Sequence, residues 1–248
     1  MTEKTLGDGA GKRIPCRVLF AVTVGFAVAI SLIDATPAAG LSPPPGLSPG
    51  DEYHLVFMSS TTRDGTSGNI ADYDAVVQAA ADSAGIGISV GTSWSAMAST
   101  GSVNARDHAV ISAPVYNLRS AALGGPELLA TNAADMWDSA LLNQIRFDES
   151  GVDLGTTDAW TGSIADGTRD PNDDYLGSST NNAWCGRSTQ TDEDWFKFLT
   201  PVKTIQLHVY GLSEVLTVPE PSSAATGVLG LLGVIAFCLK RGRTRLCW

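Results

Sequence analysis

The chain of 248 residues carries two long apolar runs, one near each end, over residues 18–33 and 224–239. Basic residues precede the first run, and small residues over 35–40 follow it. This order is typical of a secretory signal peptide, so we expect residues 1–39 to direct export and then to be removed. The alternative is an uncleaved membrane anchor, which the length of the run leaves open.

The second apolar run has 16 residues, slightly fewer than the ~20 residues of a straight transmembrane helix. Basic residues over 240–248 follow it and would hold the C-terminus on the cytoplasmic side. We therefore predict a transmembrane helix over 224–239 with a basic tail behind it, and we expect the body of the chain to lie outside.

Between these ends, the hydrophobic pattern predicts a mixed α and β domain over residues 52–218. Both faces of the segment 53–58 are apolar, which indicates a strand buried on both sides. Apolar residues then recur at helical spacing over 73–84, and Asp72 stands where a cap is expected. Alternating apolar residues over 205–209 predict a closing strand.

Two segments are predicted to be irregular. Five prolines over 37–52 exclude helix and sheet, so we assign residues 40–51 to a proline-rich linker. Residues 163–195 are dense in Gly, Asp, Asn, Ser and Thr. A loop of that length in a compact domain is usually functional or disordered.

Charge and cysteine content narrow the class of protein. Residues 40–221 hold 8 basic and 23 acidic residues, a net charge of −15. Such a surface repels nucleic acid and suits a soluble extracellular domain, one that could hold cations. Cys185 is the single cysteine of this stretch, which excludes an intramolecular disulfide and a CxxC zinc site within it.

The acidic part of the long loop is the candidate metal site. Asp170, Asn172, Asp173 and Asp174 supply four side-chain oxygens within five residues. Calcium takes six to eight oxygen ligands, and closely spaced Asp and Asn residues meet that need. The alternative is a solvated polar loop.

Tryptophans suggest a second kind of site. Trp137 and Trp160 are best explained as core residues, whereas Trp184 stands among polar residues and is a candidate for stacking on a sugar ring. We expect Asn172, Trp184 and Arg187 to contribute to ligand binding.

Motifs of enzymes are absent from the sequence. The chain holds three histidines and has no GxSxG, HExxH or phosphate-binding glycine loop. We therefore expect no enzymatic activity, although a pair of carboxylates acting as a glycosidase leaves no local signature and stays open.

The C-terminal segment resembles a known sorting signal. Pro219, Glu220 and Pro221 precede the apolar run and the basic tail, and this arrangement is similar to the PEP-CTERM signal of exported bacterial proteins. The resemblance covers residues 219–248. It implies cleavage by an exosortase, delivery to the cell surface or extracellular matrix, and an association with biofilm and exopolysaccharide. The alternative is an ordinary single-pass anchor.

The body resembles bacterial domains of C-type-lectin-like fold, some of them families of unknown function. The resemblance rests on landmarks with distinctive spacing: Trp137, Asp138, Asp148, Trp160, Thr161 and Gly162. It implies an α+β fold with short antiparallel sheets, one or two helices and a long loop region. One departure is that Gly211 stands where the last strand of such domains usually carries a cysteine bonded near the first helix. The Asp170-Pro171-Asn172 triplet is similar to the sugar-selecting Glu-Pro-Asn triplet of calcium-dependent lectins.

Together these observations predict an exported, surface-sorted protein that binds extracellular polysaccharide or another matrix component, with calcium as a bridging ion. Two alternatives stay open. One is a structural matrix protein without a small ligand, and the other is a carboxylate-dependent hydrolase of exopolysaccharide.

Overall fold

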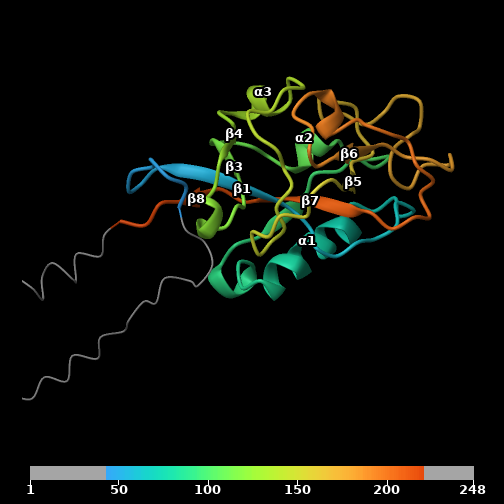
Figure 1. Ribbon diagram of the computed structural model, residues 1–248. Helices are drawn as coiled ribbons and strands as arrows, with labels where there is room; N and C mark the ends of the chain where they lie inside the picture. The colour runs from blue at the N-terminus through green and yellow to red at the C-terminus, as the bar shows by residue number, and fades with distance from the viewer. Residues whose placement is uncertain (1–42, 221–248) are drawn as a thin grey trace, which may run out of the picture. The chain divides into compact units, whose positions relative to one another are not determined.

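The computed structural model describes residues 43–220, which form a mixed α and β fold with a curled sheet and few helices (Figure 1). The segments expected to act as signal peptide, transmembrane helix and basic tail lie outside the described residues. Within residues 43–220, no helix has the length and apolar character that crossing a membrane requires.

The sheet is built around β1 (Glu52–Met58), which confirms the strand predicted over 53–58. This strand pairs in parallel with β3 (Val115–Asn117) and antiparallel with β7 (His208–Ser213). Its first residues also pair antiparallel with β8 (Leu216–Thr217). The two ends of the described chain are therefore held together in one sheet.

Shorter strands extend the sheet on both sides. Its main path runs β4-β3-β1-β7-β5-β6, and β2 pairs with β7 outside this path. The short strands are β2 (Trp94–Ala96), β4 (Leu128–Ala130), β5 (Asp158–Trp160) and β6 (Cys185–Arg187). The helices are α1 (Ala71–Ser83), α2 (Ala105–His108) and α3 (Ala133–Met136), with 3-10 turns η1 (Ile88–Val90), η2 (Ala121–Leu123) and η3 (Glu193–Trp195).

Side chains of β1 alternate between two hydrophobic cores, as the period of a strand requires. Leu55 and Phe57 pack in the core on the side of α1, whereas Val56 and Met58 pack in the core on the opposite side. Figure 1 shows α1 on one side of β1 and β7, with α2 and α3 on the other. Burial on both faces explains why the residues of β1 from Leu55 to Met58 are all apolar.

Helix α1 confirms the predicted amphipathic helix but corrects its cap. Asp72 lies in the first turn of the helix and does not cap it. The chain enters the helix earlier because the Asn69 Oδ1 accepts the Ala71 N–H at 3.3 Å. Asp72 instead places its negative charge in the first turn, where the helix dipole favours it.

Two other predicted segments differ in detail. The closing strand starts at His208 and not at residue 205, because residues 203–204 form a turn and Ile205 is exposed. Residues 43–51 contain neither helix nor strand, as predicted. They nevertheless lie against the domain, since the Gly50 N–H donates to the Val218 carbonyl at 3.0 Å.

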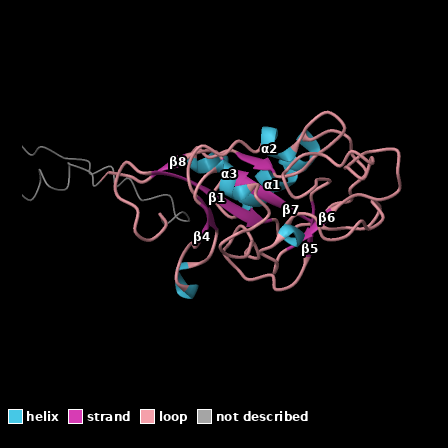
Figure 2. Ribbon diagram, turned by 90° about the horizontal axis from the view of Figure 1, so that it is seen from above, coloured by secondary structure: helices cyan, strands magenta, loops and turns pink. Residues whose placement is uncertain are grey.

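The region from β5 to β7 is mostly loop, as predicted for residues 163–195 (Figure 2). Trp160 is fully buried at its edge and donates its indole N–H to the Arg63 carbonyl at 2.9 Å. Trp137 packs against Trp195, with 6.1 Å between ring centroids. Trp160 is thus a core residue, as predicted, whereas Trp137 is only partly buried and packs against the edge of the second core.

Candidate functional site

Trp184 is held by the acidic loop. Asp170 is only 3 % exposed, and its Oδ2 accepts the indole N–H of Trp184. The other oxygen, Oδ1, accepts the Asn172 backbone N–H at 2.7 Å and the Asn172 side-chain N–H at 3.0 Å. The structure therefore brings together three of the residues selected from the sequence, and Asp170 is the one that links them.

This arrangement limits how the loop can bind calcium. Both oxygens of Asp170 accept N–H groups of the chain itself, so calcium ligation by Asp170 would use the lone pairs that remain on these oxygens. Asp173 has a left-handed backbone with a φ of 67°, and its carbonyl accepts the Thr180 hydroxyl at 2.8 Å. Among residues 43–220, no group of three or more His, Cys, Asp or Glu side chains is placed to hold a metal ion. Calcium binding by Asp170, Asn172, Asp173 and Asp174 stays a prediction.

Two lysines support the same region. The Lys197 ammonium lies 5.0 Å from the centroid of the Trp184 ring, a cation–π contact. Lys203 is buried and donates to the Ser178 carbonyl at 2.7 Å and to the Ser178 hydroxyl at 2.8 Å. Burial lowers the pKa of the Lys203 ammonium. These contacts fix the loop on both sides of Trp184, which is itself partly exposed.

Arg187 lies at the end of β6, whereas Trp184 precedes this strand. The two side chains have different partners. The Arg187 Nε donates to the Asp158 Oδ1 at 2.9 Å, and its guanidinium lies 3.7 Å from the Phe198 ring centroid. The hydrogen bond to Asp158 raises the pKa of Arg187. Within residues 43–220, no hydrogen bond or cation–π contact joins Arg187 to Asn172 or Trp184.

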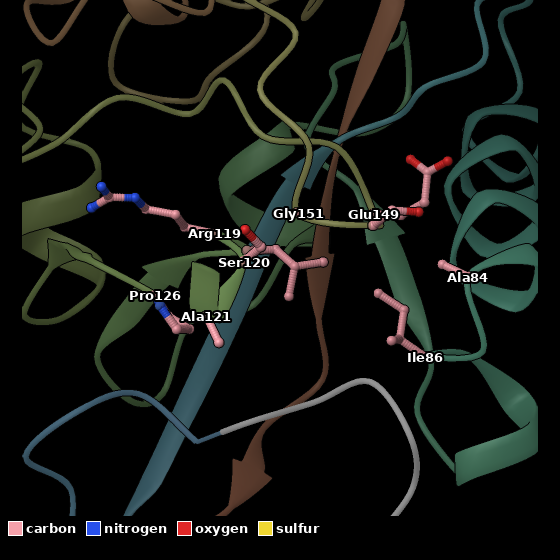
Figure 3. Close-up of a pocket in the computed structure, with 10 residues that line it drawn as sticks. Ala84, Ile86, Arg119, Ser120, Ala121, Pro126, Glu149 and Gly151 are labelled. Carbon is pink, nitrogen blue, oxygen red and sulfur yellow. The ribbon is translucent and has the colours of Figure 1, made fainter. Parts of the chain in front are cut away.

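A pocket of about 310 Å³ that the sequence did not reveal lies between α1 and η2 (Figure 3). Ile86 contributes to its apolar side, and Arg119 and Glu149 lie at its edges. Figure 3 shows the Arg119 guanidinium and the Glu149 carboxylate pointing away from each other. Glu149 is buried and accepts both the backbone N–H of Ser60, at 2.8 Å, and its hydroxyl.

Arg119 also lines a second pocket, of about 370 Å³, which Arg146 shares. We call it the double-arginine pocket; its polar and charged lining residues are Arg119, Glu127, Asn143, Gln144, Arg146, Asp153 and Thr191. The lining residues of this pocket come from three stretches of the sequence, 119–127, 142–153 and residue 191. No local motif unites them, which explains why sequence patterns did not find the pocket.

The groups with potential reactivity are engaged in the fold. The His54 Nε2 accepts the Ser112 N–H at 3.1 Å, and His54 Nδ1 lies 2.9 Å from the Ser213 carbonyl oxygen. His108 Nε2 pairs with Asp74 Oδ1 at 2.8 Å. Burial raises the pKa of the Cys185 thiol to about 12, so at neutral pH it is not the thiolate that a nucleophile requires.

The start of the candidate sorting motif is accessible. Pro219 and Glu220 are exposed directly after Val218, which is buried against the domain. Pro221 lies outside the described residues. No family model matches the chain, and no curated protein matches it.

Proposed function

We propose that this protein is an exported, surface-sorted domain of C-type-lectin-like fold that binds extracellular polysaccharide at Trp184. The observation that supports it best is the way Trp184 is held. Its indole N–H is fixed by a buried carboxylate, and part of the side chain stays exposed beside Asn172 and a lysine. A rigid, amphipathic aromatic ring loses little entropy on binding, which suits recognition of a sugar ring.

The arrangement of the ends supports a lectin-like fold. The first strand pairs with the last strands in an antiparallel manner, and α1 packs on them. A Cβ atom built on Gly211 would lie 3.0 Å from the Cβ of Val77 in α1. Disulfide-bonded cysteines have Cβ atoms about 3.5–4.5 Å apart. β7 and α1 thus approach each other as closely as the disulfide of such domains would require, although neither residue is a cysteine here.

The exposure of Pro219 and Glu220 supports surface sorting. A sorting enzyme must reach an extended segment, and these residues leave the domain directly after its last strand. The domain that precedes Pro219 is closed by backbone hydrogen bonds. One of them runs from the Val218 N–H to the Asp51 carbonyl at 2.9 Å. Cleavage near the motif would therefore leave residues 43–218 intact.

The test is binding of the purified protein to extracellular polysaccharides in affinity gels, compared with Trp184→Ala and Trp184→Phe. We expect Trp184→Ala to weaken binding about tenfold, equivalent to about 1.4 kcal/mol, and Trp184→Phe to keep most of it because the aromatic face is retained. Equal retardation of all three proteins would exclude the Trp184 site. Migration unaffected by any polysaccharide, with and without calcium, would instead favour a structural matrix protein.

A further inference from the structure

The double-arginine pocket places two guanidinium groups on one aromatic ring. The Cζ atoms of Arg119 and Arg146 lie 5.9 Å and 5.6 Å from the ring centroid of Phe147. Phe147 is buried, so it supports both side chains without filling the pocket. As Figure 3 shows, the Arg119 guanidinium is turned away from Glu149 and the neighbouring pocket.

Hydrogen bonds within the protein use only part of the capacity of these arginines. Each guanidinium has five N–H donors. Arg119 pairs with Glu127 through one terminal nitrogen, and its buried Nε has no partner. Arg146 donates to Asp153 at 2.7 Å and to Gln144 at 3.3 Å. Donors therefore remain for a ligand at a place where the side chains are already oriented.

The rest of the domain is strongly acidic, which makes the meeting of two arginines in one pocket informative. Residues 40–221 hold 8 basic residues against 23 acidic ones, and two of the 8 meet in this pocket. A planar guanidinium matches the geometry of a carboxylate with two parallel hydrogen bonds. Glu127 and Asp153 balance the two arginines, so these four side chains carry no net charge. The remaining N–H donors suit a single carboxylate, whereas a densely anionic polymer such as a nucleic acid would need excess positive charge.

The rim of the pocket suits a sugar ring. Leu123 is 44 % exposed and Leu142 is 57 % exposed, and both line the pocket beside polar residues. Apolar surface next to hydrogen-bonding groups matches the two faces of a pyranose. The volume of about 370 Å³ is within the ~300–1,000 Å³ of small-ligand pockets.

From these observations we infer that the double-arginine pocket is a subsite for the carboxylate of an acidic sugar, a uronic acid residue of the bound polysaccharide. This inference rests on the proposed function, because it takes the ligand to be a polysaccharide. It adds a second contact point, separate from Trp184, and it assigns the chemical class of the sugar.

The experiment is calorimetric titration of the full chain with a uronic acid oligosaccharide and with the same oligosaccharide after reduction of its carboxyl groups to alcohols. We expect the wild-type protein to bind the acidic form at least about tenfold more tightly, as expected for a charged hydrogen-bonded contact. Arg146→Gln should remove most of this preference, because it should lower the affinity for the acidic form much more than the affinity for the reduced form. Arg146→Lys should restore part of it, because it keeps the charge and loses the planar fork.

Arg106→Gln is the matched control. Arg106 is 46 % exposed on α2, and its ion-pair distances of 3.9 Å and 4.0 Å are long. Equal wild-type affinity for both oligosaccharides, or an unchanged preference in Arg146→Gln at an unchanged Tm, would overturn the inference and leave the proposed function standing. Binding of neither oligosaccharide, nor of any other polysaccharide, would overturn both.

Discussion

Gly186 marks the closest approach of β6 to another part of the backbone. A Cβ atom at this position would lie 1.9 Å from the Trp195 carbonyl oxygen, so no other residue fits without displacing η3. Trp184 and Cys185 precede this glycine directly, and their positions depend on the same contact. The position of Trp184 therefore depends on glycine at residue 186 as well as on the side chains that surround Trp184.

Gly186→Ala should destabilise the domain by about 3 kcal/mol, at the upper end of the usual cost of overpacking. Urea unfolding monitored by tryptophan fluorescence measures this change. Gly68→Ala is the control, because a Cβ there meets nothing closer than 3.8 Å. Equal stability of the two variants would show that β6 and η3 are not packed as described.

Sequence patterns predicted some residues and not others for a physical reason. Periodic burial along β1 and α1 made their core residues recognisable, and Trp160 was placed in the core correctly. Trp137, also expected in the core, is only partly buried. The link between Asp170 and Trp184 spans 14 residues of loop, where no period relates sequence to space. The acidic neighbours of Asp170 suggested metal ligation, which stays a prediction, but they gave no sign of its hydrogen bonds to N–H groups.

At the scale of elements, α1 packs on β7. In lectin-like domains, a disulfide usually joins the last strand to the region of the first helix. Because Gly211 has no side chain, Val77 of α1 can pack directly against the backbone of β7 in the hydrophobic core. These two elements meet through apolar packing, so their proximity can be tested by introducing a disulfide between them.

Val77→Cys with Gly211→Cys should form a disulfide after a shift of a few tenths of an ångström. Closing a loop of this size stabilises a domain by up to about 4–5 kcal/mol, which corresponds to a rise in Tm on the order of 10 °C between reduced and oxidised protein. Mass spectrometry and thermal unfolding check both statements. Val77→Cys alone should show no redox-dependent Tm, and failure of the double variant to cross-link would contradict the packing of α1 on β7.

At the scale of the whole molecule, the acidic domain contains several buried groups whose neutral form the fold protects. Burial raises the pKa of Cys185 from 9.0 to about 12, and it raises the pKa of Tyr73 and of Tyr210 above the ordinary value of 10.0. The folded state holds these protons more tightly than the unfolded state, so their contribution is complete below pH 9 and is lost above it. Burial also raises the pKa of Tyr53 and of Tyr116, whereas it lowers the pKa of Lys203, which acts in the opposite direction.

The free energy of unfolding should therefore be level near neutral pH and fall from about pH 9 upward, by as much as about 1.4 kcal/mol per pH unit for each group that titrates. Urea unfolding between pH 7 and pH 11 measures the slope. Cys185→Ala should move the onset to about pH 10, where only the tyrosines contribute. Stability that stays constant up to pH 11 would contradict the burial of these groups.

The pairing of β1 with β8 has a geometric consequence. Both ends of the described chain leave the sheet beside this pair, whereas β5, β6 and the loops around them lie at the other end of the sheet (Figure 1). If the domain were attached to a surface through the segment after Val218, its loop-rich end would face away from the attachment point. Polymer chains passing above that surface would meet Trp184 before they meet the attachment point.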